Sequence, residues 1–257
     1  SIESRNKEFE ALSYKWLGKI NFSLSQFDLA STYYRRALKI LENTRNNTEF
    51  YECTFLLGES LFSAGDNSES LNQFYEYQVY TAKQKNRIGL IAVKKRMAEV
   101  YVKLNNIDQA ISLYNEVSVL EQQQGNQSGY VEAQNRLGNL YLSQQQGQQA
   151  IETFSKSERA AKSSRNKKDV ANTLRQQSSA YRAAGNVEKE LSVRQEALTI
   201  SEELADVPAQ AAENLEIGNV YIEQQKADEA IPYIEKSIGL AESTGDMEQK
   251  GRALKSL

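Results

Sequence analysis

Cys53 is the only cysteine in a chain of 257 residues that contains no histidine. Histidine is the side chain that most often acts as a general acid or base near neutral pH, activates a nucleophile or binds a metal. Cys53 therefore lacks its usual activating partner, and one thiol makes neither an internal disulfide nor a multi-thiolate zinc site. The composition predicts a protein that is not an enzyme and that uses no metal or other cofactor.

A second set of side chains is suited to binding a protein or a peptide. Asparagine amides pair with both the N–H and the C=O groups of an extended peptide, lysine and arginine hold carboxylates, and phenylalanine supplies apolar anchors. We expect these side chains to form one binding face. The candidates are Lys15, Lys19, Phe22, Phe55, Glu59, Phe62, Lys95, Glu99, Asn135, Asn139, Arg175, Arg182 and Asn219.

The candidates keep fixed distances from a small residue that recurs every 40 residues without insertion or deletion. They stand three positions before it, or one or four positions after it. A small residue on the first helix of a hairpin lets the second helix pack against its backbone, and a large side chain there would wedge the helices apart. The small residues are Gly18, Gly58, Ala98, Gly138, Ser178 and Gly218.

Two further series mark the turns. Asparagine or aspartate recurs at positions 46, 86, 126, 166, 206 and 246, where it caps the start of a helix, and a second turn falls near residues 25, 65, 105, 145, 185 and 225. We expect a first helix over about 7–23 and a second over about 28–43, repeated every 40 residues. The approximate repeats are 7–46, 47–86, 87–126, 127–166, 167–206 and 207–246, and 247–257 begins a seventh, which makes 1–257 one array.

This pattern resembles the tetratricopeptide repeat, and the fourth repeat carries it best with Leu137, Gly138, Tyr141, Ala150 and Phe154. The resemblance implies an all-α fold, a right-handed α-solenoid of antiparallel helix-turn-helix hairpins, with the candidate residues in a groove on the concave side. The family's usual repeat has 34 residues, and the 40-residue repeat looks like the longer variant of many bacterial signalling proteins. The tyrosines that follow the small residue by three positions should lie in the core: Tyr101, Tyr141, Tyr181 and Tyr221.

Departures from the pattern fall in the first and fifth repeats. Asn21 stands at an aromatic position, and Gln177, Glu190 and Arg194 replace apolar residues. We expect looser packing around these two repeats. After residue 250 the sequence reproduces the opening of another first helix, so we expect the chain to be part of a longer protein.

The charge and the hydropathy of the sequence limit the kinds of partner that this chain can have. The chain has 31 basic and 34 acidic residues, whereas a general nucleic-acid binder is strongly basic on one face, so we expect no nucleic-acid partner. Its apolar runs are far shorter than the roughly 18 residues that cross a bilayer, so we expect no membrane span in this segment. The compartment stays open, with the cytoplasm favoured, and so does the oligomeric state.

These observations predict a non-enzymatic protein-binding or peptide-binding module. The resemblance implies the sensory or regulatory region of a larger bacterial signalling protein, such as a sensor histidine kinase or a transcriptional regulator. Two alternatives remain: a structural scaffold for assembly, and a relative of the peptide-regulated phosphatases that act on response regulators.

Overall fold

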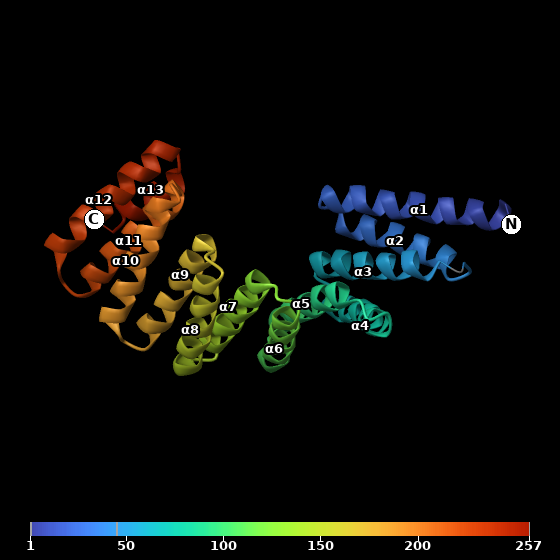
Figure 1. The fold of residues 1–257 in the computed structure, drawn as a ribbon. Helices are drawn as coiled ribbons and strands as arrows, with labels where there is room; N and C mark the ends of the chain where they lie inside the picture. The colour runs from blue at the N-terminus through green and yellow to red at the C-terminus, as the bar shows by residue number, and fades with distance from the viewer. Residues whose placement is uncertain (1, 45, 257) are drawn as a thin grey trace. The chain divides into compact units, whose positions relative to one another are not determined.

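The computed structural model describes residues 2–44 and 46–256, with side chains from residue 6 onward. The described residues form thirteen α-helices and no strand (Figure 1). Leu257, with which the expected seventh repeat ends, lies outside the described residues. The helices are α1 (Ile2–Ser23), α2 (Phe27–Leu41), α3 (Asn47–Ala64), α4 (Asn67–Lys83), α5 (Arg87–Lys103), α6 (Ile107–Gln123), α7 (Gln127–Ser143), α8 (Gly147–Ser163), α9 (Lys167–Ala183), α10 (Val187–Glu203), α11 (Val207–Glu223), α12 (Ala227–Thr244) and α13 (Met247–Leu254).

The chain divides into two compact units, one ending at Leu120 and the other beginning at Glu121. Within the first unit, α1 pairs with α2 and α3 with α4, and α2 packs on α3. Within the second unit, α7 pairs with α8, α9 with α10 and α11 with α12, and each hairpin packs on the next. The fold is an α-solenoid of antiparallel helical hairpins, as predicted.

Helix capping explains where every first helix after α1 starts. In α3, α5, α7, α9, α11 and α13 the side chain of the expected Asn or Asp accepts a hydrogen bond from the backbone N–H three residues later. The distances run from 2.9 Å at Asp246 to 3.3 Å at Asn46. Each cap satisfies one of the four amide groups that a helix start leaves unpaired.

The turn inside each hairpin requires a left-handed residue. Glycine meets this requirement at Gly65 (φ 94°) and Gly185 (φ 67°), where it costs no steric strain. Elsewhere a larger residue takes the same conformation, as Gln145 does at φ 60°. The second predicted series of turns is therefore confirmed at all its positions: Ser25, Gly65, Asn105, Gln145, Gly185 and Gln225.

The small residue lies against the second helix of its own hairpin. A Cβ atom on Gly138 would lie 2.5 Å from Cζ of Phe154, and one on Gly58 would lie 2.6 Å from Cε1 of Phe74. The predicted close approach is confirmed. Phe154 and Phe74 are fully buried, so the aromatic ring fills the space that the missing side chain leaves.

The four tyrosines are only partly in the core. Tyr181 is buried, whereas Tyr101, Tyr141 and Tyr221 are half-buried. Tyr141 and Tyr221 pack against clusters of buried residues in their hairpins. The hydroxyl of Tyr101 shares an exposed hydrogen bond with that of Tyr75. The expectation is therefore confirmed for Tyr181, confirmed in part for Tyr141 and Tyr221, and wrong for the hydroxyl end of Tyr101.

The fifth repeat replaces apolar packing with a buried ion pair. Glu190 and Arg194, which stand where other repeats carry alanine and an aromatic residue, are joined at 3.1 Å between Oε1 and Nε. Both side chains are buried, as is Gln177, whose amide donates to the hydroxyl of Ser155. In the first repeat Asn21 is also buried and donates to the carbonyl of Leu17 at 2.7 Å. These departures fill the interior with polar groups that are mostly paired, although the side-chain oxygen of Gln177 has no hydrogen-bond partner among the described residues. Looser packing around these two repeats stays a prediction.

Candidate protein-binding face

The outward side of the first helices after α1 carries mostly polar side chains. On a helix, residues that are three or seven positions apart lie on one face. The residue directly after the small residue therefore shares a face with two earlier residues, which stand two and six positions before the small residue. We call these positions of α1, α3, α5, α7, α9 and α11 the first-helix face. Each compact unit contains its own part of this face.

In the first unit, ion pairs join the first-helix face from one helix to the next. Nζ of Lys19 on α1 lies 3.2 Å from Oε1 of Glu52 on α3. Nε of Arg96 on α5 lies 2.8 Å from Oε1 of Glu59 on α3, and its Nη1 lies 2.8 Å from Glu99. Burial raises the pKa of Glu59, and Arg96 opposes that effect. Three of the predicted residues, Lys19, Glu59 and Glu99, therefore lie on this face and are already paired.

Arg96 and Glu52 were missed by the prediction of binding residues. They stand two and six positions before the small residue, whereas the prediction used three positions before it. Arg96 is 42% exposed at its side chain and bridges two helices of the face. A count of residues along the helix at 100° per residue would have found both, because that count places them beside Glu59 and Glu99.

The position three before the small residue does not face open solvent. Lys15 is buried between α1 and α3, where its Nζ lies 2.9 Å from Oε2 of Glu52. Asn135 is buried in the second unit, donates to Thr173 at 3.0 Å and accepts from Ser157 at 2.7 Å. The expectation that these two residues point into a groove is wrong, because this side of a first helix is covered by the helices that follow it.

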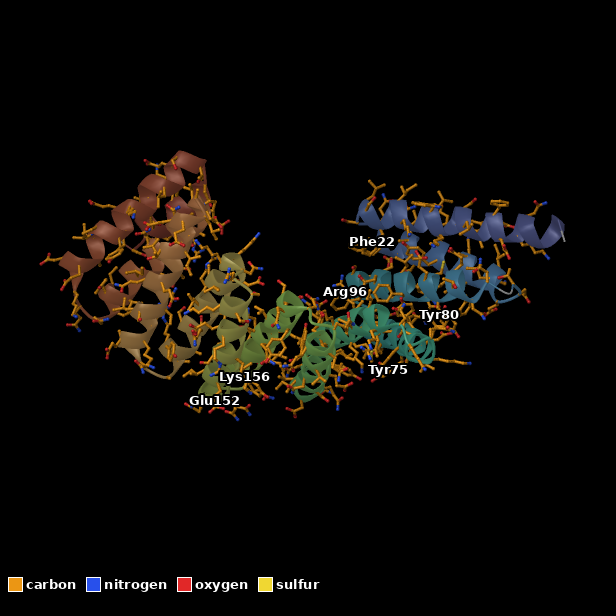
Figure 2. All side chains as sticks on the ribbon, in the orientation of Figure 1. Phe22, Tyr75, Tyr80, Arg96, Glu152 and Lys156 are labelled. Carbon is orange, nitrogen blue, oxygen red and sulfur yellow. The ribbon has the colours of Figure 1, made fainter. Side chains whose placement is uncertain are left out.

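The phenylalanines are half-buried and packed within their hairpins. Phe22 lies edge-on to Phe27 with ring centroids 5.3 Å apart (Figure 2). Phe55 packs against Phe74 and Tyr77 of α4 at 5.5 and 4.9 Å. Phe22 and Phe55 contribute to the interior of the first unit. Phe62 and Lys95 are also half-buried, and Lys95 has a partner.

In the second unit, amides and arginines line the face. Asn139 on α7 is exposed and donates to Oε1 of Gln176 on α9 at 2.7 Å. Asn219 is half-buried on α11, and its side-chain amide has no hydrogen-bond partner among the described residues. Arg182 is exposed and pairs with Glu190 at 2.8 Å. These three predicted residues lie where a partner can reach them.

A buried charge network lies beneath these residues. Arg175 on α9 approaches Glu213 of α11 at 3.1 Å, and Arg194 approaches the same carboxylate at 3.5 Å. Glu213 is buried, and burial is the main reason that its pKa is raised, while Arg194 and Arg175 lower it. Glu216, a half-buried residue of the first-helix face, forms ion pairs with both Arg182 and Arg194. Arg175 is therefore a structural partner of Glu213 as well as a candidate binding residue.

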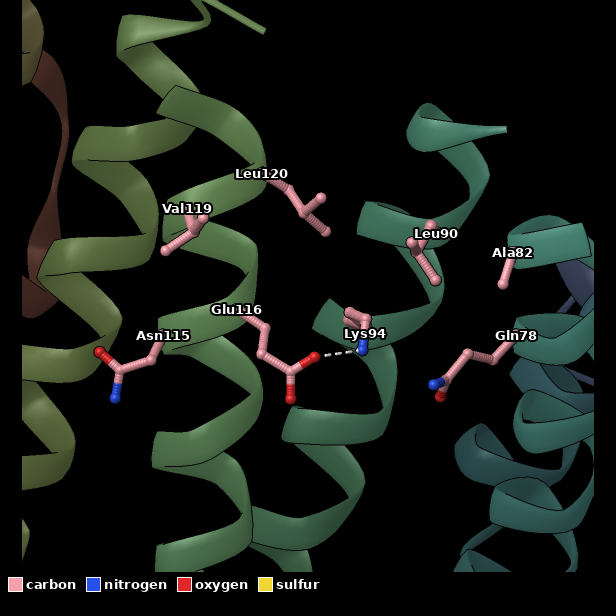
Figure 3. Close-up of a pocket in the computed structure, with 8 residues that line it drawn as sticks. All are labelled: Gln78, Ala82, Leu90, Lys94, Asn115, Glu116, Val119 and Leu120. Atoms are coloured by element: carbon pink, nitrogen blue, oxygen red, sulfur yellow. Dashed lines mark hydrogen bonds and ion pairs between the residues drawn. The ribbon is translucent and has the colours of Figure 1, made fainter. Parts of the chain in front are cut away.

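A groove opens on another side of the first unit, between α4, α5 and α6. Its volume is about 530 Å³, and Leu90, Val119 and Leu120 give it an apolar lining. Figure 3 shows Lys94 of α5 reaching Glu116 of α6, with Nζ 2.6 Å from Oε2. In the second unit the corresponding place holds Lys156 and Arg159 in a smaller hollow of about 300 Å³. The two hollows therefore differ in charge although they share a place in the repeat.

No group of three potential metal ligands occurs within residues 2–44 and 46–256. Across the same described ranges, no helix is both long and apolar enough to cross a bilayer.

Cys53 is fully buried on α3, where burial raises the pKa of its thiol to about 12. The thiolate is the reactive form, so at pH 8 we expect Cys53 to react with Ellman's reagent about 1,000-fold more slowly than a free cysteine. Unfolding in guanidinium should restore the ordinary rate. Rapid labelling of the folded chain would contradict the assignment of Cys53 to the interior.

Hairpins that stack side by side, with a polar row along their first helices, define a helical-repeat protein of the α-solenoid class. Models of the tetratricopeptide repeat match residues 129–203, and residues 11–43 and 214–244. The chain belongs to the tetratricopeptide repeat family, whose repeats typically serve as protein-binding modules without catalytic activity.

Several solved structures share the fold at low sequence identity. A signal transduction ATPase with numerous domains from Pyrococcus horikoshii, which has a tetratricopeptide repeat sensor, is 17% identical with a TM-score of 0.76; the match covers 96% of this chain and 39% of that one. Aspartyl phosphate phosphatase F from Bacillus subtilis is 13% identical with a TM-score of 0.70, over 96% and 73% of the two chains. A Rap protein complexed with competence and sporulation factor is 14% identical with a TM-score of 0.57, over the same shares. No curated protein matches the chain in sequence.

Proposed function

We propose that this chain is a non-enzymatic module that binds an extended peptide segment along the first-helix face of its second unit. The observation that carries the proposal is the placement of two amides, Asn139 on α7 and Asn219 on α11, at the same position of their repeats, together with the exposed Arg182 on α9. Asn219 has no internal partner among the described residues, and Asn139 has only the half-buried Gln176. An amide in such a place can exchange a weak surface bond for two bonds to a peptide backbone.

The charges of this face favour a peptide with some acidic character. Arg182 is exposed and is shared between Glu190 and Glu216. Because Glu216 is only 27% exposed and already pairs with Arg194, a ligand carboxylate can engage the outer side of Arg182 without breaking the network. The buried network below holds the arginine in place before binding, which lowers the entropy lost on association.

We further propose that the module is the sensory or regulatory region of a larger signalling protein. The similarity in fold to a signal transduction ATPase that has a tetratricopeptide repeat sensor, over 39% of that chain, supports this context. A sensor histidine kinase or a transcriptional regulator would use the array in the same way, by coupling peptide binding to a neighbouring domain. A purely structural scaffold would instead bind partners constitutively.

The test is selection of peptides by the purified chain from a diverse library, followed by titration with the best peptide. Asn139→Ala and Asn219→Ala should each weaken binding about tenfold, because each removes a pair of hydrogen bonds worth about 1.4 kcal/mol in total. Gln195→Ala is the matched control, since Gln195 is an exposed amide on α10, away from the face. Failure to select any peptide, or equal affinity of all three variants, would refute the proposal.

A second candidate function is dephosphorylation of a response regulator, favoured by the similarity in fold to an aspartyl phosphate phosphatase over 96% of this chain. Incubation of the chain with a phosphorylated receiver domain separates the two functions. A module that only binds leaves the rate of phosphate loss unchanged.

A further inference from the structure

Helix α1 exposes an apolar stripe that the proposed function does not use. Phe9, Trp16, Leu17, Ile20 and Leu24 are between 39% and 63% exposed. They recur at intervals of three, four or seven residues, so they share one side of the helix, with Ser13 among them. We call these six residues the α1 stripe.

In every other full-length first helix, the two positions equivalent to Leu17 and Ile20 are buried. The residues that correspond to Leu17 and Ile20 in α3, α5, α7, α9 and α11 are at most 8% exposed, whereas Leu17 is 39% and Ile20 52% exposed. In α3 this side is covered by the preceding second helix, α2: the hydroxyl of Ser60 donates to the carbonyl of Phe27 at 2.9 Å. No described residue covers α1 in this way. The buried equivalents are Leu57, Met97, Leu137, Gln177 and Ile217, and Ser60, Val100, Leu140, Ala180 and Val220.

The order of residues in the α1 stripe is self-complementary. Suppose that two copies of α1 lie antiparallel and cross midway between residues 16 and 17. Each residue of one copy then faces the residue of the other copy for which the two residue numbers add up to 33. Phe9 then faces Leu24, Ser13 faces Ile20 and Trp16 faces Leu17, so every member of the stripe meets another member. The small Ser13 opposite the large Ile20 gives each copy a recess for a side chain of the other.

The charges beside the α1 stripe are compatible with this pairing. The same register places Glu10 opposite Ser23 and Lys19 opposite Tyr14, so no like charges meet. Lys19 is held by Glu52 of its own chain, and its Nζ also lies 5.1 Å from the centre of the Trp16 ring. The two stripes can therefore meet without breaking the ion pair between Lys19 and Glu52.

We infer that the α1 stripe binds a second copy of this chain, α1 against α1 in antiparallel orientation, to form a two-fold symmetric dimer. Two-fold pairing uses one surface patch twice and closes on itself, so it produces dimers and no longer polymers. Coverage of the stripe removes five large apolar side chains of each copy from water, which is the main source of affinity in such interfaces.

Trp16 reports directly on this interface because it is the only tryptophan in the chain. Sedimentation equilibrium of the whole chain from about 1 µM to about 1 mM should show a monomer–dimer equilibrium. The emission of Trp16 should shift to the blue over the same concentrations, since its ring moves from water into the interface.

Ile20→Glu should raise the dimer dissociation constant at least tenfold, because it places two carboxylates in an apolar contact. Ile88→Glu is the matched control: Ile88 is 76% exposed at the start of α5, outside the α1 stripe. Circular dichroism of each variant checks that the helices are intact.

The antiparallel register is tested by charge exchange. Ser13→Lys alone should weaken the dimer, while Ser13→Lys combined with Ile20→Glu should bind at least about tenfold more tightly than either single variant, because the two introduced charges face each other across the two-fold axis. They stand seven residues apart in one helix and cannot pair within a copy. A chain that stays monomeric, as it would if the stripe served a different partner or a preceding helix, overturns the inference. Equal effects of Ile20→Glu and Ile88→Glu, or a double variant weaker than both single ones, overturn it as well.

Discussion

Gly138→Leu is expected to lower the stability of the second unit by about 3 kcal/mol or more. A Cβ atom at this position would lie 2.5 Å from the ring of Phe154, which is fully buried and cannot move away without opening the α7–α8 hairpin. Overpacking of a dense interior costs about 1–3 kcal/mol even for smaller insertions. The measurement is the urea midpoint of unfolding followed by circular dichroism.

Gly239→Ala is the control for this change. Gly239 lies within α12 and has no atom within 4 Å of the place of an added Cβ. Alanine there should stabilise the helix by about 1 kcal/mol, since glycine is the poorer helix former. If the two substitutions changed stability in the same direction, close approach of the paired helices would not be the reason for the recurring small residue.

Arg194→Met is expected to lower stability by about 2–4 kcal/mol, because it removes the buried cation shared by the carboxylates of Glu190 and Glu213 and leaves them only the partly exposed Arg182 and Arg175. Arg136→Met, at an exposed arginine of α7, should change stability by no more than about 0.5 kcal/mol. Thermal and urea unfolding of both variants give the comparison.

A triple variant distinguishes the buried charge from the shape of the side chain. Glu190→Ala, Arg194→Leu and Glu213→Val together restore apolar residues at positions where other repeats carry them, and we expect this chain to be nearly as stable as the original or more so. A triple variant as unstable as Arg194→Met would mean that the fifth repeat requires the ion pairs themselves.

The hairpins could be predicted from the sequence because their determinants are local and repeated. The caps at Asn86 and Asp206 act within three residues, and the contact of Gly138 with Phe154 joins residues of one hairpin. Each signal recurs at the same register, so six copies of a weak pattern made one strong prediction.

The binding face could be predicted only in part, because it depends on how successive first helices lie against one another. Lys19, Asn139 and Arg182 lie on the surface as expected, while Lys15 and Asn135 are covered by the following helices. The pairing of Glu190 with Arg194 could not be predicted from the sequence for a different reason. Each residue looked like a defect at its own position, and only their contact across one turn of α10 shows that they replace an apolar pair.

The central claim, that a partner binds along the first-helix face of the second unit, is tested most directly by photo-crosslinking. A benzophenone side chain at position 176 on α9 reports on that face, and one at position 195 on α10 reports on the second helices. With the best selected peptide bound, we predict a crosslink from position 176 and none from position 195. Crosslinking from position 195 alone would contradict the claim and place the partner on the second helices.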